Sequence, residues 1–326
     1  MKKHKVIITR RLEDRVEKRM RELFNVNLSQ AEYPISRQEL LSSVKEADIL
    51  VPTIGDKIDA SILSAASSNL KLIANYGAGY DHIDIKTALQ RGIIVTNTPS
   101  VLTTDTADMT MALILAIPRK LREGHEEMQS GSWKGWSPSA MIGMRITGKK
   151  LGILGMGRIG QAIAKRAKAF DLDINYHNRR RLHQNIEEDL SARYWENLEE
   201  MLSTIDILVV SASLNPSSLY LLDAKCLGKM KRTAYLVNIS RGEIIDQKAL
   251  VRQLKDGQLG GAGLDVYDSE EIIGSDFKSL KNVFLLPHMG SSTLEGRIEM
   301  GEKVIINIKT FIDGHRPPDQ IVPSML

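Results

Sequence analysis

The sequence predicts an α/β protein built from two doubly wound parallel-sheet domains. Two observations predict this fold class. Short apolar runs alternate with helix-period segments almost from end to end of the 326 residues, which is the pattern of parallel strands joined by crossover helices. The alternation pauses once, near residue 100, and then resumes with a glycine-rich turn in LGILGMGRIG. Each series is long enough to form a sheet with helices on both faces, so we expect two such bodies.

The first series contains four apolar runs that we interpret as strands. They are KVIIT, ADILVP, LKLIANY and GIIVTN, and they are separated by segments such as LEDRVEKRMRELF, whose apolar residues recur three and four apart. We assign residues 1–99 to this domain. The segment 292–314 is an amphipathic helix pattern with no sheet of its own to cover, so we expect residues 289–326 to return to the first domain.

The second series occupies residues 100–288. It opens with residues 103–129, which we predict to form one long helix, apolar nearly all round in its first half and buried between the two bodies. Six strand-like runs follow: KKLGILGMG, DLDINYH, DILVVSAS, AYLVNIS, GAGLDVY and VFLLPH. Six strands with their crossovers complete one doubly wound domain.

The composition limits the classes of function. No apolar run approaches the roughly 18 residues of a membrane span, so we expect a cytoplasmic protein without a membrane partner. Cys226 is the only cysteine and the histidines show no HExxH spacing, so we expect neither an internal disulfide nor a metal. A net charge of +4 and 5% aromatic residues argue against nucleic acid as a partner.

The glycine-rich turn predicts dinucleotide binding. Gly155, Gly157 and Gly160 have the spacing G-x-G-x-x-G between the strand-like Leu151–Leu154 and a helix pattern. In that context the first glycine permits a tight turn, the second lets the backbone approach a pyrophosphate, and the third lets the helix pack on the strand. We expect the cofactor to contact Gly155, Gly157, Arg158, Ile159 and Gly160.

The end of the next strand, INYHNRRR, indicates which dinucleotide. In NAD enzymes an Asp or Glu about 20 residues after the glycine turn binds the adenosine ribose hydroxyls. Here Asn178 occupies that place, and Arg179, Arg180 and Arg181 follow it. These side chains would bind a 2′-phosphate by donating charge-assisted hydrogen bonds to it, so we predict NADPH in preference to NADH. The alternative is a solvated turn that is basic by chance.

Three stretches at predicted carboxyl ends of strands carry groups suited to acid, base or anion chemistry. They are VNISRGEIID with Arg241, GAGLDVYDSE with Glu270, and LLPHMGSST with His288. Together these groups suit a 2-keto acid. The arginine would hold the carboxylate and polarise the carbonyl, the histidine would exchange the hydroxyl proton, and the acid would orient the histidine.

With these motifs in order, the whole chain resembles the D-isomer-specific 2-hydroxyacid dehydrogenases. The resemblance includes NYGAGYDHIDI and GIIVTNTPSVLTTDTAD as well as the glycine turn and the three catalytic stretches. It implies a Rossmann nucleotide domain inserted into a discontinuous flavodoxin-like substrate domain, and a homodimer. Within the family, the arginine-rich turn looks most like glyoxylate/hydroxypyruvate reductases that prefer NADPH.

The resemblance also implies roles for individual residues. Arg241 anchors the carboxylate and carbonyl, His288 protonates the nascent alkoxide, and Glu270 is its partner. The remaining implied contacts are backbone N–H groups of Ala78 and Gly79 for the carboxylate, Ile54 for the pocket wall, Asp265 for the nicotinamide carboxamide, Thr106 for the cofactor and Trp136 toward the partner subunit.

Some positions depart from the family pattern. Glu270 and Glu271 stand where the family usually has Glu-Pro, so Glu271 is the alternative catalytic acid. Ser213 and Met289 replace a usual proline and isoleucine near the site. Two other functions stay open: a D-2-hydroxyacid dehydrogenase for lactate-like or bulkier keto acids, and a corepressor-like protein that senses nicotinamide dinucleotides without turnover.

Overall fold

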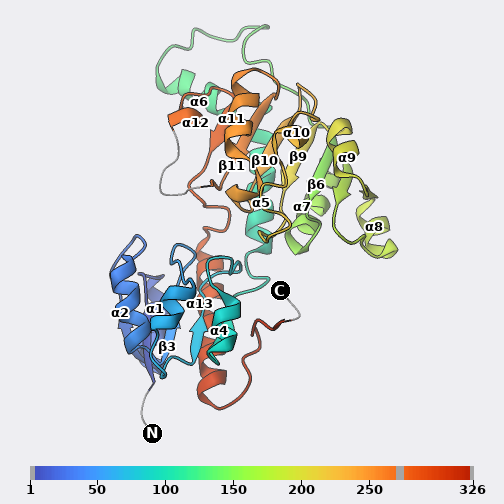
Figure 1. Cartoon of the computed structure of the whole chain (residues 1–326). Helices are drawn as coiled ribbons and strands as arrows, with labels where there is room; N and C mark the ends of the chain where they lie inside the picture. The colour runs from blue at the N-terminus through green and yellow to red at the C-terminus, as the bar shows by residue number, and fades with distance from the viewer. Residues whose placement is uncertain (1–3, 269–274, 324–326) are drawn as a thin grey trace. The chain divides into compact units, whose positions relative to one another are not determined.

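The computed structural model describes residues 4–268 and 275–323, and the chain divides into two compact units (Figure 1). One unit is Met1–Leu102 with Ser292–Leu326, and the other is Thr103–Ser291. Both contain a wholly parallel sheet, so the predicted fold class of two doubly wound α/β domains is confirmed.

The first unit has a five-stranded sheet in the order β2-β1-β3-β4-β5. This order, 2-1-3-4-5, is that of flavodoxin-like folds. One strand, Asn25–Leu28, was not predicted, because NVNL alternates exposed and half-buried residues at the sheet edge and contains no apolar run. The strands are β1 (Lys5–Ile8), β2 (Asn25–Leu28), β3 (Ile49–Val51), β4 (Leu72–Ala74) and β5 (Ile94–Thr96).

Helices in the first unit begin at residues that cap them. Ser36, for example, forms a capping box with Glu39 at the start of α2. The helix near the end of the chain, α13, packs its apolar residues against α1 and the sheet, and Gly301 permits this because an added Cβ would lie 2.4 Å from Val16. The helices are α1 (Asp14–Leu23), α2 (Arg37–Glu46), α3 (Ala60–Ala65), α4 (Ile85–Gln90) and α13 (Leu294–Ile312).

The second unit has a seven-stranded sheet in the order β12-β11-β10-β9-β6-β7-β8. Counted from β6, the order is 3-2-1-4-5-6-7, which is the Rossmann arrangement extended by one strand. The two-residue edge strand Arg193–Tyr194 was not predicted. The strands are β6 (Lys150–Leu154), β7 (Asp173–His177), β8 (Arg193–Tyr194), β9 (Ile207–Val210), β10 (Tyr235–Asn238), β11 (Gly261–Leu264) and β12 (Val283–Leu285).

The predicted single helix over 103–129 is wrong, because the chain forms two helices there. They are α5 (Thr103–Ala116) and α6 (Leu121–Gln129). Pro118 lacks the N–H that a continuous helix requires, and Lys120 adopts the left-handed conformation with φ 54°. The other helices of this unit are α7 (Arg158–Ala169), α8 (Gln184–Leu190), α9 (Leu198–Thr204), α10 (Ala224–Leu227), the 3₁₀ turn η1 (Gly242–Ile244), α11 (Gln247–Lys255) and α12 (Ser275–Lys278).

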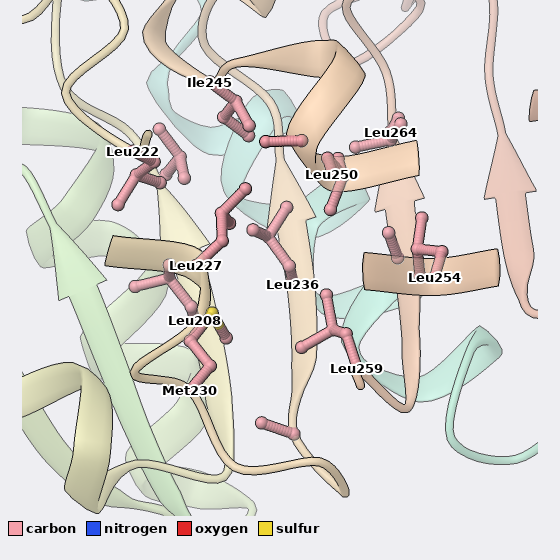
Figure 2. Packing of buried hydrophobic residues seen from close by; sticks show 14 of the residues in the cluster. Leu208, Leu222, Leu227, Met230, Leu236, Ile245, Leu250, Leu254, Leu259 and Leu264 are labelled. Atoms are coloured by element: carbon pink, nitrogen blue, oxygen red, sulfur yellow. The ribbon is translucent and has the colours of Figure 1, made fainter. Parts of the chain in front are cut away.

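Apolar side chains cover both faces of the second sheet. On one face, leucines of β9, β10 and β11 pack against α10 and α11 (Figure 2). On the other face, α5 and α7 pack over β6, β7 and β9. Burying each such side chain stabilises the fold by about 1.5–3 kcal/mol, so the two layers hold the strand ends in fixed register.

Two kinds of feature are absent from the described parts of the chain. Between residues 4 and 268 and between 275 and 323, no helix is long and apolar enough to cross a membrane. In the same ranges, no group of three or more His, Cys, Asp or Glu side chains is placed to hold a metal ion.

Candidate active site

The glycine-rich turn follows β6 and has the geometry of a pyrophosphate site. Gly155 has φ 98°, and a Cβ there would lie 2.5 Å from the backbone nitrogen of Ala212. A Cβ on Gly160 would lie 2.4 Å from the carbonyl oxygen of Gly155. Both positions therefore require glycine, the first for its backbone conformation and both for close approach.

The second glycine of the motif, Gly157, faces open space. A Cβ on Gly157 would meet no atom within 4 Å, and α7 begins at the next residue without a side-chain cap. The first turn of α7, with exposed Arg158 and half-buried Ile159, thus presents uncapped N–H groups and the positive end of the helix dipole. These residues fit the phosphates of a dinucleotide.

Asn178, directly after β7, fastens the glycine turn to the basic turn. Its Oδ1 accepts a hydrogen bond from the Met156 N–H at 2.7 Å, and its carbonyl accepts one from the Tyr194 hydroxyl at 3.3 Å. Its side-chain oxygen is therefore engaged within the protein. The Nδ2 group supplies the donors with which Asn178 can contact a ribose or phosphate.

The three arginines of the basic turn have different surroundings. Arg181 bonds Glu187 through Nε at 3.0 Å and Nη2 at 2.7 Å, so its guanidinium is already engaged. Arg179 and Arg180 are exposed, and within the described residues neither has a hydrogen bond or ion pair. The cations available to an anionic ligand are therefore two of the predicted three.

A buried carboxylate holds this turn in place. Glu187 accepts bonds from Arg181 and from the hydroxyl of Tyr176, whose side chain is fully buried on β7. The bonds from Arg181 first, and then from Tyr176, hold the pKa of Glu187 below its usual range. Burial, and then the bond to Glu187, raise the pKa of Tyr176 to about 12. The Tyr176 hydroxyl also accepts the Leu182 N–H at 3.0 Å, so both ends of the turn are fixed.

Three of the candidate residues, Arg241, Asp265 and His288, follow the carboxyl ends of adjacent strands, β10, β11 and β12 respectively. Asp265 follows β11 and is 1% exposed. Its carboxylate accepts the backbone N–H groups of Met289 and Gly290, both at 2.7 Å, and its own N–H bonds the Asn238 carbonyl at 3.0 Å. Asp265 thus joins the end of β10 to the loop after β12. Thr106, at the start of α5, lies beside the same loop, 3.8 Å from a Cβ built on Gly290.

Arg241 follows β10 in a turn that Asn238 organises. The Asn238 side chain donates to the Arg241 carbonyl at 2.9 Å and accepts from the Ser240 N–H at 3.1 Å. Gly242 is required next, since a Cβ there would lie 1.9 Å from the carbonyl carbon of Tyr267. Arg241 is half-buried and donates to the Ser240 carbonyl at 2.7 Å.

His288 follows β12 in the left-handed conformation, with φ 52°. This conformation is uncommon outside glycine, and the hydrogen bonds that the next two N–H groups donate to the Asp265 carboxylate hold the backbone there. No pattern in the sequence predicts this second task of Asp265. Glu270 and its alternative Glu271 lie outside the described residues.

The first unit brings together its own three candidates. Ile54 follows β3 and is 36% exposed, and Ala78 and Gly79 follow the adjacent β4. A Cβ on Gly77 would lie 3.1 Å from Cγ2 of Ile54, so the apolar side chain borders the 77–79 loop. Asn75 and Asn97, which sequence reasoning missed, donate to carbonyls of this loop. Their only sequence signal is a position just after or at a strand end.

Known proteins match most of the length of this chain. Residues 111–290 match the family model described as the NAD-binding domain of D-isomer specific 2-hydroxyacid dehydrogenases. A glyoxylate reductase of Pyrococcus furiosus is 43% identical over 320 residues, which are 97% of this chain and 94% of the relative.

Solved structures match over the same extent. A crystal structure described as that of a D-isomer specific 2-hydroxyacid dehydrogenase from Polaromonas has a TM-score of 0.91 and 37% identity, covering 98% of this chain and 99% of the other. The NADPH-dependent glyoxylate/hydroxypyruvate reductase of Sinorhizobium meliloti, in complex with NADP and malonate, has a TM-score of 0.86 and 30% identity, covering 98% and 97%.

Proposed function

Since the chain belongs to the D-isomer-specific 2-hydroxyacid dehydrogenases, we propose that it reduces glyoxylate, and also hydroxypyruvate, with NADPH as the preferred cofactor. The products are glycolate and D-glycerate. The names of the relatives support the substrates. One observation carries the cofactor preference. Arg179 and Arg180 are exposed and have no hydrogen bond or ion pair among the described residues, and they lie on the turn where NAD enzymes carry an acid that binds the ribose hydroxyls.

The residues of the second unit perform the proton and charge chemistry. A nicotinamide cofactor, when bound, supplies the hydride. Arg241 binds the substrate carboxylate and polarises the carbonyl, since its guanidinium offers several donors to both oxygens. His288 donates a proton to the carbonyl oxygen as negative charge develops there, and Glu270 orients the imidazole. Because the acid must be protonated, we expect reduction to slow and oxidation to speed up as pH rises.

Three further groups position the reactants. In this proposal the N–H groups of Ala78 and Gly79 hold the substrate carboxylate, and Ile54 forms an apolar wall. Asp265 accepts a hydrogen bond from the amide of the nicotinamide, since its carboxylate lies at the carboxyl end of β11, where an open α/β sheet presents its ligands. Thr106 contacts the cofactor from the start of α5.

Arginine substitutions test the cofactor preference. Arg179→Ala with Arg180→Ala removes the cations that would bond the 2′-phosphate, and each such bond is worth about 1.5–3 kcal/mol. We expect the ratio of kcat/KM for NADPH to that for NADH to fall at least tenfold. Arg193→Ala is the matched control, because that exposed arginine on β8 stacks on Trp195. An unchanged ratio in the double variant would show that the turn does not select the cofactor.

We also propose that the enzyme is a cytoplasmic homodimer. Six exposed apolar side chains lie within and after α6, and exposed apolar side chains that form one patch are typical of a protein–protein interface. They are Leu121, Met128, Trp133, Trp136, Met141 and Ile142. Trp136 is 85% exposed and is the side chain we expect to reach the partner's site. Sedimentation of the wild type and of Trp136→Ala measures the oligomeric state, and glyoxylate kinetics of the same two proteins test whether Trp136 reaches the partner's site. A monomeric wild type would contradict both the homodimer and this role of Trp136.

A further inference from the structure

The loop Gly77–Gly79 is held by its carbonyl oxygens. The Gly77 oxygen accepts hydrogen bonds from Asn75 Nδ2 and from the Thr98 N–H, both at 3.0 Å. The Ala78 oxygen accepts one from Asn97 Nδ2 at 2.7 Å. The Gly79 oxygen accepts the second bond of Asn75 Nδ2, at 2.8 Å. Every carbonyl of the loop is therefore fixed in direction by an amide or backbone donor.

These bonds also determine where the loop's N–H groups point. The described peptide bonds are all trans, and in a trans peptide the C=O of one residue and the N–H of the next point to opposite sides. Fixing the Gly77 and Ala78 carbonyls therefore turns the N–H groups of Ala78 and Gly79 the other way. Within the described residues, neither N–H has an acceptor. Two adjacent N–H groups without an internal acceptor form a concavity suited to an anion.

The orientation of the Asn75 amide is determined by its surroundings. The residue is fully buried, and its Oδ1 lies 3.1 Å from Nε2 of His82. If the amide were rotated by half a turn, its oxygen would face the carbonyl oxygens of Gly77 and Gly79 without a proton between them. Only the orientation with Nδ2 toward both carbonyls satisfies these contacts, and it assigns the donated proton to His82 Nε2.

We propose that Asn75 and Asn97 are positioning residues, which hold the 77–79 loop so that the N–H groups of Ala78 and Gly79 face a substrate carboxylate. The inference rests on the proposed function and deepens it. It assigns to two side chains that do not touch the substrate the task of setting substrate affinity. The substrate carboxylate is bound equally in the ground state and in the transition state. Removing either side chain should therefore raise KM with little change in kcat.

Asn97 is the better position to test, because it is half-buried and makes one side-chain bond to the loop, whereas Asn75 is fully buried. Asn97→Ala removes the donor to the Ala78 carbonyl and frees the following peptide to rotate. We expect KM for glyoxylate to rise about fivefold, the equivalent of one lost hydrogen bond. Asn97→Asp should raise KM further, because a carboxylate would face the Ala78 carbonyl and repel the substrate anion. KM for NADPH should stay within about twofold in both variants.

Thr98→Val is the matched control for a change beside Asn97. The Thr98 hydroxyl is buried and has no partner among the described residues, and the substitution retains the backbone N–H. KM for glyoxylate should therefore remain within about twofold of the wild-type value. If Asn97→Ala and Asn97→Asp leave KM for glyoxylate unchanged, or lower kcat alone, the positioning role is refuted.

A binding measurement separates this inference from the proposed function. Oxalate, a carboxylate that cannot be reduced here, is titrated calorimetrically into the wild type and Asn97→Ala with saturating NADP⁺. Weaker binding by the variant supports the positioning role even if glyoxylate is not the substrate. Equal oxalate affinity in the two proteins refutes it even if the wild type turns over glyoxylate.

Discussion

Replacing Glu187 with glutamine should lower the stability of the nucleotide-binding unit. The side chain of Glu187 is 7% exposed and accepts bonds from Arg181 and from Tyr176. A charge-assisted bond is worth about 1.5–3 kcal/mol, and glutamine retains one acceptor oxygen, so we expect a loss of about 2 kcal/mol. The side chain of Arg181 is 63% exposed, so water hydrates its guanidinium when the bond to Glu187 is lost. The loss of stability is therefore smaller than for a buried charge left without a partner.

Differential scanning calorimetry provides the assay. For a unit of this size, about 2 kcal/mol corresponds to a decrease in Tm of about 4–8 °C. Glu188→Gln is the matched control, because Glu188 is exposed on the same helix and its side chain bonds only Gln184 among the described residues. That variant should melt within about 2 °C of the wild type. Equal melting temperatures for Glu187→Gln and Glu188→Gln would refute the structural role of the buried carboxylate.

The pH dependence of this effect has a definite sign. The folded protein holds the pKa of Glu187 below its value in the unfolded chain, first through Arg181 and then through Tyr176. The stability that the carboxylate contributes is therefore fully present above its unfolded pKa of 4.5 and is lost as pH falls through the lower folded pKa. The Tm difference between wild type and Glu187→Gln should be constant near neutral pH and shrink in acid.

Three further substitutions test residues that follow the carboxyl ends of β10, β11 and β12. Gly242→Ala should unfold the site or prevent expression of soluble enzyme, because its Cβ would overlap the backbone of Tyr267; circular dichroism and Tm measure this. Asp265→Asn loses at least one of the acceptor oxygens that fix the loop after β12, so kcat should fall about 10–100-fold. Fluorescence titration measures the cofactor affinity of this variant separately. His288→Gln should reduce kcat at least 100-fold while NADPH still binds, and retained activity with a flat pH profile would remove His288 from the proton transfer.

Much of the fold could be predicted from the sequence because its central strands are continuous apolar runs buried on both faces. LGILG and DILVV are examples, and such runs have few alternatives to a parallel sheet. The edge strands β2 and β8 could not be predicted in this way, because they are short, half-exposed and held by pairing with a neighbour. The break at Pro118 was missed because the segment after it, LREGHEEMQ, also forms a helix, so only the proline marks the end of the first one.

Site residues could be proposed from the sequence where a residue type is tied to a chemical task, as for the glycine turn and Arg179. It was less predictable where a side chain serves the backbone. Asp265, Asn75 and Asn97 act through hydrogen bonds to main-chain groups that are distant in sequence or hidden in a loop, and no local pattern identifies those partners. Arg181 shows the converse, since a third arginine in a row pairs with Glu187 rather than adding to the free cations.

The most direct test of the central claim is the loss of NADPH and NADH absorbance by the purified protein with glyoxylate, hydroxypyruvate, pyruvate and phenylpyruvate in parallel. We predict fast oxidation of NADPH with glyoxylate or hydroxypyruvate, and slower oxidation of NADH. Turnover restricted to pyruvate or phenylpyruvate would replace the proposed substrate with a lactate-like or bulkier keto acid. If no keto acid is reduced while NADPH binds, the proposed reductase function is contradicted and a sensing role takes its place.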